Sequence, residues 1–334
     1  MSAAGAPIVG IVGAGVVGSA VGRALGRRGV RVAWSDERVG AAVRAAEQLG
    51  GVAVDAVDDL RVTDVIVLAG RARQARLAED LVRAGIPVVS TSDACDDVRA
   101  MLDLDQAAID AGVPLVVGAA MCPGLTGLLA AGLAHRLAEV DEVHVAMHGT
   151  GGPDCARQHH DALGDTSIAW HDGEWIERPG GAGRELCWFP DPIGALDCYR
   201  AALPDPVLLH RAFPTAGRVS ARVSATRRDR LTARLPMLTP PRRAGDIGAV
   251  RVEVRGAGPT GERVTDIAGA GGRAGSLAGA VAALYAEVVA AGELAPGVRV
   301  AGEDAALATR LLRRAAGLGM ALQTFTGVAR PTHW

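Results

Sequence analysis

Lysine is absent from this sequence, and all 35 basic residues are arginine. The absence excludes every reaction that needs a lysine amine, including Schiff-base formation, phosphate binding by a loop lysine and general-base catalysis by lysine. Pyridoxal enzymes, most phosphate-loop NTPases and lysine-dependent aldolases are therefore excluded.

The sequence also lacks an excess of either charge, because it contains 35 basic and 37 acidic residues. Neither nucleic acid nor an acidic membrane surface would find its usual electrostatic attraction. Hydrophobic residues make up 49% of the 334 residues and charged residues 22%, so disorder is not expected. A chain of this length and composition predicts a globular protein of about two domains.

Signals for membrane insertion, secretion and disulfide bonding are weak. The uncharged stretch from Ala111 to Ala134 is long enough to cross a bilayer, but Pro114, Pro123 and several glycines interrupt it. The five cysteines form an odd number without close pairing, and no basic and then apolar leader opens the chain. We therefore expect a cytoplasmic protein that does not bind membranes.

A glycine-rich turn follows the first apolar run, and helical spacing of apolar residues follows the turn. In such a turn the first glycine permits a tight bend, the second lets the backbone approach a pyrophosphate, and the third lets helix and strand pack closely. The pattern predicts a dinucleotide-binding site. Its six residues are Gly13, Ala14, Gly15, Val16, Val17 and Gly18.

An acidic residue stands where a ribose-binding carboxylate belongs. Asp36 follows the second apolar run, and 36 minus 18 places it eighteen residues after Gly18. A carboxylate there accepts hydrogen bonds from a ribose 2′-hydroxyl and repels a 2′-phosphate, which favours NAD. Arg38 can still receive a 2′-phosphate, so NADP stays an alternative. A glycine-rich helix start in another α/β protein, with Asp36 as an ordinary strand end, is the competing interpretation.

Strand and helix patterns continue to alternate through the first third of the chain. Strands are expected at 64–69, 88–90 and 114–118, and helices at 73–84 and 96–111. Their Val, Ile and Leu runs are typical of strands buried on both faces, so an N-terminal Rossmann domain with a doubly wound parallel sheet is predicted. Ligands of such a sheet bind at the carboxyl ends of its strands. The residues expected there include Ala69, Gly70, Arg71, Ser92, Asp93, Cys122 and Pro123.

After Val140 the pattern changes to alternating apolar and polar residues, which predicts half-buried strands. Similar stretches at 207–213, 219–225, 249–255 and 263–268 indicate a second, α+β domain built on a mixed or antiparallel sheet. The stretch 149–206 between them is expected to be irregular but ordered, because it contains three tryptophans. The expected domains are 1–123, 124–270 and a helical segment at 271–334.

Three motifs together resemble the saccharopine dehydrogenase-like oxidoreductases: the glycine turn, the strand end Val-Val-Ser-Thr-Ser-Asp at 88–93, and the run Cys-Pro-Gly-Leu-Thr at 122–126. The last run is similar to that family's Pro-Gly-Leu-Thr/Ser signature before a helix. The resemblance is specific over about the first 150 residues and weaker beyond. It implies an NAD(P)-binding first domain, a second domain for substrate binding and dimerisation, and a C-terminal segment that packs back on the first domain.

The resemblance also implies an activity and a set of roles. Family members reduce or oxidise a carbon–nitrogen bond in an amino acid adduct, so an amino acid-derived substrate and a homodimer are expected. By the same resemblance Gly13, Gly15 and Gly18 hold the pyrophosphate, Asp36 the ribose, Ala69, Gly70 and Ser92 the nicotinamide side, and Asp93, Cys122 and Pro123 line the reaction cleft. Several members use lysine in their sites, so saccharopine itself is not expected as the substrate.

Candidate catalytic groups follow from what hydride transfer needs, a proton source or a group that polarises the acceptor. His148, near a strand end, is the candidate general acid, although a strand histidine is often merely solvated. Cys122 is either a thioester-forming nucleophile, activated by the helix that starts at Gly124, or a buried inert thiol.

Substrate-binding candidates lie in the stretch 149–206. Arg157 and Arg184 can hold a substrate carboxylate through paired hydrogen bonds. Cys155, His159 and His160 invite a zinc interpretation, but the two histidines are adjacent and cannot share one helix face, and no second Cys/His pair has metal spacing. We therefore expect no metal and place His159 and His160 in the substrate pocket.

These patterns favour a two-domain NAD(P)-dependent oxidoreductase that acts on an imine or secondary amine of an amino acid adduct. A semialdehyde or other carbonyl dehydrogenase on the same cofactor domain is one alternative, and it requires a reactive Cys122 thiolate. A dinucleotide-sensing protein without turnover is the other, because a fold alone does not grant catalysis.

Overall fold

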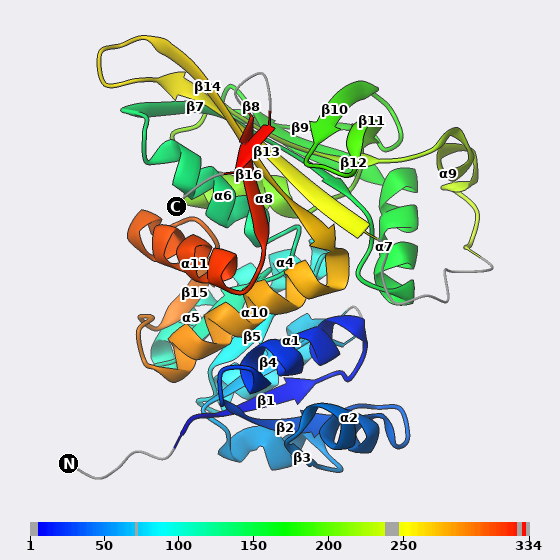
Figure 1. The fold of residues 1–334 in the computed structure, drawn as a ribbon, viewed down its shortest axis with the longest axis vertical. Coiled ribbons are helices and arrows are strands. Elements are labelled where there is room, and N and C mark those ends of the chain that lie inside the picture. The colour runs from blue at the N-terminus through cyan, green and yellow to red at the C-terminus, as the bar shows by residue number, and fades with distance from the viewer. Residues whose placement is uncertain (1–5, 71–72, 238–246, 326–328, 332–334) are drawn as a thin grey trace.

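Two β-sheets and the helices packed on them form the structure, a computed structural model that describes residues 6–70, 73–237, 247–325 and 329–331. The first sheet comes mainly from the N-terminal third of the chain and the second from the middle (Figure 1). The end of the chain contributes to both, because β15 (Gly297–Val300) joins the first sheet and β16 (Ala321–Phe325) and β17 (Ala329–Pro331) join the second.

The first sheet has seven strands, all parallel, in the order β15-β6-β5-β4-β1-β2-β3. Its central strands β4, β5 and β6 are buried at every position, because helices cover both faces. The expectation of a doubly wound parallel sheet is confirmed. The strands from the N-terminal part are β1 (Ile8–Val12), β2 (Arg31–Ser35), β3 (Val52–Ala53), β4 (Val65–Leu68), β5 (Val88–Ser90) and β6 (Pro114–Val117).

The helices on this sheet include one from far along the chain. Helix α10 (Ala274–Ala290) is buried along most of its length and packs on α1 (Val16–Gly26), where a Cβ at Gly279 would lie 2.5 Å from the Cβ of Ala20. The close approach of the two helix backbones therefore depends on that glycine. The remaining helices are α2 (Ala41–Leu49), the 3₁₀ helix η1 (Val57–Val62), α3 (Gln74–Arg83), α4 (Cys95–Leu102) and α5 (Asp105–Asp110).

The single helix expected over 96–111 is two helices, α4 and α5, separated at Asp103 and Leu104. The Asp105 carboxylate at the start of α5 accepts a hydrogen bond of 2.7 Å from the backbone N–H of Val298 in β15. Helix α5 is thus tied to the returning C-terminal strand, a long-range contact that local spacing does not show.

The second sheet is mixed, as expected, with the order β10-β11-β12-β7-β13-β14-β16-β17 and the β8–β9 hairpin attached to β12. Strands β7 and β12 are parallel, whereas the other pairings are antiparallel. The strands not yet bounded are β7 (Glu139–His148), β8 (Thr166–His171), β9 (Glu174–Pro179), β10 (Glu185–Phe189), β11 (Gly194–Arg200), β12 (Arg218–Ser224), β13 (Ile247–Ala257) and β14 (Arg263–Arg273).

Two expectations for the middle of the chain are wrong. The stretch 149–206 is regular, because it forms helix α7 (Pro153–Gly164) and strands β8 to β11, with Asp172 and Gly173 in the tight turn between β8 and β9. An Asp-Gly pair with positive φ at both residues favours such a hairpin.

The expected strand at 207–213 is the helix α8 (Asp205–Ala212). Pro206 stands in its first turn, where a missing N–H breaks no helical hydrogen bond. Leu208 and Leu209 are both buried but contact different parts of the core, so a short apolar run satisfies a helix here as well as a strand.

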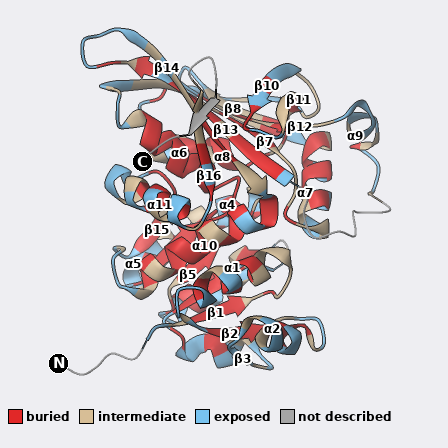
Figure 2. Ribbon diagram, in the orientation of Figure 1, coloured by how far each residue is buried: buried red, intermediate tan, exposed pale blue. Residues whose placement is uncertain are grey.

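A shared core lies between the two sheets. Helix α6 (Leu125–Ala134) is buried at nearly every position and packs on β13 and on α11 (Ala305–Gly317). Figure 2 shows buried residues along α6 and α10. The apolar residues of β7, Val143, Val145 and Met147, belong to this core, while the intervening residues lie on the outer face of the second sheet.

The uncharged stretch 111–134 forms β6, α6 and the turn between them. Among the residues that the structure describes, no helix has the length and apolar character that a membrane crossing requires.

Candidate active site

The glycine turn lies at the point where the strand order of the first sheet reverses, between β1 and its neighbours β2 and β4. Gly13 has a φ of +102°, and a Cβ there would lie 2.6 Å from the backbone nitrogen of Gly70. A Cβ at Gly18 would overlap the carbonyl oxygen of Gly13. At Gly15, in contrast, a Cβ would have no atom within 4 Å. Gly13 and Gly18 are thus required by the turn itself, whereas Gly15 keeps space open outside it.

That open space belongs to a cavity of about 450 Å³ between the first turns of α1 and α10. Gly15, Val16 and Ser19 line it on one side, and Arg273 and Ser276 on the other. Two helix N-termini, with their free N–H groups and positive dipole ends, therefore meet at the cavity. Such an arrangement suits an anion of the size of a pyrophosphate.

Asp36 follows β2 directly, and its side chain is only 4% exposed. Its carboxylate accepts a hydrogen bond of 2.6 Å from the N–H of Ala14 and pairs with Arg38 through two bonds of 2.9 Å. Burial raises the pKa of Asp36, but the hydrogen bonds from Arg38 and Ala14 outweigh burial and hold this pKa below its ordinary value. The carboxylate is therefore ionised and connects the glycine turn to the end of β2.

The strand ends beside the turn have different local roles. Ala69 donates its N–H to the carbonyl of Val12 at 2.8 Å, and Gly70 packs against Gly13. Ser92 is buried and donates its hydroxyl to Asp97 at 2.7 Å, and that carboxylate also accepts the first N–H groups of α3. The Ser92 hydroxyl thus serves the local structure. Arg71 lies outside the described residues.

A cluster of one carboxylate, one thiol and one imidazole lies at the carboxyl end of β5. Asp93 follows that strand, and Cys155 and His159 stand one turn apart on α7. The Cys155 Sγ lies 3.3 Å from Asp93 Oδ2 and 3.6 Å from His159 Nε2, and His159 Nε2 lies 3.4 Å from the same Oδ2. These three ligand atoms are close enough together to hold one metal ion.

A second buried cluster joins the turn after β6 to α8. Cys122 donates its thiol proton to Asp205 Oδ2 at 3.1 Å, and the Thr126 hydroxyl donates to the other oxygen of Asp205 at 2.6 Å. Asp205 is 0% exposed. Pro123 follows Cys122 through a cis peptide bond and packs against Gly118. Cys122 is therefore buried close to a strand end and has an acidic partner.

Two thiols in this region, Cys122 and Cys95, are protonated at neutral pH. The pKa of Cys122 is raised well above its ordinary value, first by burial and then by the Asp205 carboxylate. Burial likewise raises the pKa of Cys155, and that of Cys95 to about 12. Burial lowers the pKa of His159, but Cys155 and Asp93 outweigh burial and raise it well above its ordinary value. Two carboxylates, Asp93 and Asp205, thus lie close to these thiols in the described part of the chain.

Other predicted site residues lie elsewhere. His148 contacts Ser224 at 2.7 Å and the Phe189 ring, on the outer face of the second sheet. Arg157 pairs with Asp154 on α7, and Arg184 pairs with Asp197 while remaining 70% exposed.

His160 is buried next to His159, and its Nε2 contacts the carbonyl of Leu235 at 3.0 Å. Of the predicted catalytic and substrate-binding residues, the structure thus brings Asp93 and His159 together.

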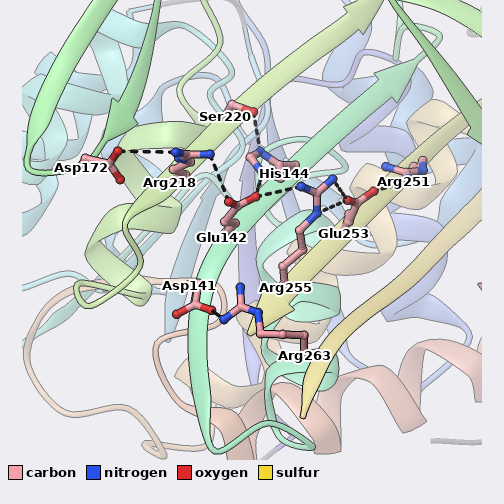
Figure 3. A network of polar contacts seen from close by, with 10 residues as sticks. All are labelled: Asp141, Glu142, His144, Asp172, Arg218, Ser220, Arg251, Glu253, Arg255 and Arg263. Atoms are coloured by element: carbon pink, nitrogen blue, oxygen red, sulfur yellow. Dashed lines mark hydrogen bonds and ion pairs between the residues drawn. The ribbon is translucent and has the colours of Figure 1, made fainter. Parts of the chain in front are cut away.

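The outer face of the second sheet holds a different polar network around a cavity of about 460 Å³ (Figure 3). Glu142 contacts His144, Arg218 and Arg255, and Arg255 continues to Glu253. Each of these acids is paired with a cation. The lining of the cavity as a whole is richer in cations, with Arg178, Arg200, Arg218, Arg222, Arg251 and Arg255 against Glu142, Glu185 and Glu253.

Sequence reasoning missed several residues at the inner site. Asp205 falls in the stretch that the sequence predicts to be irregular, although a carboxylate between Pro204 and Pro206 is typical of a helix start. Arg273 and Ser276 at the cofactor-sized cavity come from the start of α10, and no local pattern connects that helix to the glycine turn.

Neither a protein-family model nor a curated protein matches the sequence. Among solved structures, apo saccharopine dehydrogenase (L-Glu forming) from Saccharomyces cerevisiae is similar with a TM-score of 0.69 and 15% identity, over 95% of this chain and 99% of that chain. GenD2 from gentamicin A biosynthesis, in complex with NAD, has a TM-score of 0.48 and 16% identity, over 100% of this chain and 98% of that chain. The WlbA dehydrogenase from Bordetella pertussis, in complex with NADH and UDP-GlcNAcA, has a TM-score of 0.44 and 17% identity, over 99% and 100%. By the first of these likenesses, this chain has a saccharopine dehydrogenase-like fold.

Proposed function

We propose that this protein is an NAD-dependent oxidoreductase that acts on a carbon–nitrogen bond, an imine or secondary amine, of an amino acid adduct. The observation that carries the proposal is the cavity at the N-termini of α1 and α10, where Gly15 keeps space open although neither strain nor packing requires a glycine there. A backbone pyrophosphate contact is the physical reason for a glycine at such a position.

The cofactor residues follow from this placement. Gly13, Gly15 and Gly18, with Ala14, Val16 and Val17, bind the pyrophosphate, and Asp36 receives the ribose hydroxyls at the end of β2. NAD supplies or accepts the hydride when bound. Arg38 already lies on the Asp36 carboxylate and is 61% exposed, so it can turn toward a 2′-phosphate, which keeps NADP as the alternative cofactor.

The acidic inner region favours a substrate that carries a positive charge on nitrogen. Asp93 lies at this end of the first sheet, and a protonated imine or amine would be stabilised there by its negative charge. Reduction then adds hydride to the carbon of the protonated imine and gives the amine. The described contacts of His148, with Ser224 and Phe189, lie on the outer face, so the proposal assigns it no role.

The state of Cys122 argues against the semialdehyde alternative. A thioester mechanism needs a thiolate, and Cys122 is a buried thiol that donates to a carboxylate and has a raised pKa. The residue therefore shapes the wall of the site and forms no covalent intermediate.

The same proposal includes the domain roles, with residues 1–123 for the cofactor and 124–270 for the substrate and for dimerisation. Of residues 271–334, α10 and β15 pack on the first domain, whereas β16 and β17 join the second sheet, so the expectation of a helical segment packed only on the first domain is wrong. A homodimer in the cytoplasm, with a small amino acid-derived substrate, completes it.

The test is NADH oxidation measured across a matrix of 2-oxo acids combined with amines, each component also assayed alone. We expect turnover that needs both a carbonyl compound and an amine. Turnover of an aldehyde alone with NAD, lost on alkylation of Cys122, would transfer the assignment to the semialdehyde alternative. NAD binding by calorimetry without any turnover would instead support a dinucleotide sensor.

A further inference from the structure

Of the cluster Asp93, Cys155 and His159, the proposed reaction uses only Asp93. The distances between the three ligand atoms indicate a second role for the cluster. Tetrahedral zinc with bonds of about 2.3 Å to sulfur and about 2.0–2.2 Å to nitrogen and oxygen places its ligand atoms about 3.3–3.6 Å from one another. The three distances in the cluster are 3.3, 3.4 and 3.6 Å. The ligand atoms therefore already occupy three corners of a zinc tetrahedron.

The two residues on α7 are arranged as chelating pairs usually are. Cys155 and His159 are four residues apart, so their side chains project from the same face of the helix. His159 is 6% exposed, its Nε2 faces Cys155 and Asp93, and its buried Nδ1 has no hydrogen-bond partner. The polar contacts described for the His159 ring are therefore made by Nε2, the atom that would bind the ion.

The charges of the cluster also match a divalent cation. A thiolate and a carboxylate together carry two negative charges, which one Zn²⁺ neutralises, and a neutral imidazole completes the set. A sulfur ligand and an imidazole favour zinc over magnesium or calcium, which prefer oxygen.

We propose that Asp93, Cys155 and His159 bind one zinc ion and leave its fourth coordination position open. Three protein ligands and an open position are the arrangement of catalytic rather than structural zinc sites. The open position would take an oxygen lone pair of the substrate, because the nitrogen of a protonated imine has none, and would orient the substrate for hydride transfer. That last role rests on the proposed function, whereas the metal site itself does not.

The test measures metal content and coordination, independently of activity. The full-length protein, purified without chelators and dialysed, is analysed for metals by mass spectrometry, and we expect about one zinc ion per chain. Cys155→Ser and His159→Gln should each lose most of it. Two matched controls, Cys95→Ser and His160→Gln, replace a nearby thiol and the adjacent histidine and should keep it. Thermal melting checks that every variant is folded.

Cobalt substitution identifies the ligands directly. After zinc removal, added Co²⁺ should produce a thiolate-to-cobalt charge-transfer band that is present in Cys95→Ser and absent in Cys155→Ser. Wild-type protein without bound zinc and without this band would overturn the inference, as would equal zinc content in all four variants. Calorimetric NAD binding on the same samples separates the two proposals: NAD binding without metal refutes only the zinc site, and metal without NAD binding refutes only the oxidoreductase.

Discussion

Charged groups cluster both on the outer face of the second sheet and at the inner end of the first sheet, but the groups that they contact differ. On the outer face Glu142 and Glu253 are enclosed by arginines and by His144, so each negative charge meets a positive one within the protein. At the inner end Asp93 and Asp205 face thiols, a hydroxyl and one imidazole.

This difference separates stability from ligand binding. A carboxylate that is already paired with arginine gains little from a cationic ligand, and the network loses stability when one partner is removed. A carboxylate that contacts only thiols, a hydroxyl and an imidazole is completed by a bound cation or a positively charged substrate. The comparison therefore predicts that inner variants change ligand binding and that outer variants change stability.

The largest effect is expected at the cofactor cavity. Gly15→Val places a side chain in open space, so the fold should remain, while NAD affinity should fall at least about 100-fold, or about 2.7 kcal/mol. Gly317→Val is the matched control, because that glycine also has open space around it and lies far from the cavity. Calorimetry and thermal melting measure both quantities. Unchanged NAD affinity in Gly15→Val would remove the basis of the cofactor assignment.

On the outer face, Glu253→Gln should cost about 1–3 kcal/mol of stability at neutral pH and leave NAD binding unchanged. Burial raises the pKa of Glu253, but Arg251 and Arg255 outweigh it and hold the pKa below 4.5. Because the folded-state pKa is lowered, the stability that the carboxylate contributes is present above about pH 4.5 and is lost as the pH falls further. The Tm difference between wild type and variant should therefore shrink on acidification. A constant difference from pH 7 to pH 3 contradicts this account.

Asp36 sharpens the comparison, because it lies at the inner site yet pairs with arginine as the outer acids do. We expect Asp36→Ala to reduce the preference for NAD over NADP by about tenfold, since it removes the carboxylate that repels a 2′-phosphate. Calorimetric titration of both nucleotides measures the ratio. If an acid that pairs with arginine has only a structural role, the variant should lose stability and keep the wild-type ratio of NAD affinity to NADP affinity.

The smallest effect is expected at Cys122. A raised thiol pKa means a very small thiolate fraction at pH 8, so alkylation of Cys122 should be slow. Cys122→Ser should keep its turnover within about tenfold of wild type, because serine can still donate to Asp205. Peptide mapping after alkylation and steady-state rates of the variant test both points. Rapid, substrate-protected alkylation together with an inactive variant would show that the thiol reacts.

The sequence predicts the N-terminal strands of the first sheet well, because the patterns that indicate each strand lie within a short stretch of the chain. The strand at 88–90 is found at its expected residues, and the glycine turn and Asp36 are adjacent in space because consecutive parallel strands are. The outer and inner clusters were not predictable in the same way. Asp93 and Cys155 are 62 residues apart and Cys122 and Asp205 are 83 apart, so only the assembled fold brings them together.

The proposed zinc site shows the same limit of prediction from sequence. The adjacency of His159 and His160 argues against a shared site, and the structure agrees that they contact different groups. The relevant spacing is instead that of Cys155 and His159, one helical turn apart, and their third partner comes from the end of β5. A motif search within one segment cannot find a site divided between a helix and a distant strand.

The position of β15 in the first sheet has a consequence for how the protein folds during its synthesis. It pairs with β6 through residues 297–300, and α10, which covers α1, also lies beyond residue 273. When the ribosome has made the first 123 residues, the sheet still lacks its edge strand and a covering helix. We therefore expect the nascent dinucleotide-binding half to remain incomplete until almost the whole chain has emerged, so that its folding is post-translational and slower than that of a contiguous Rossmann domain.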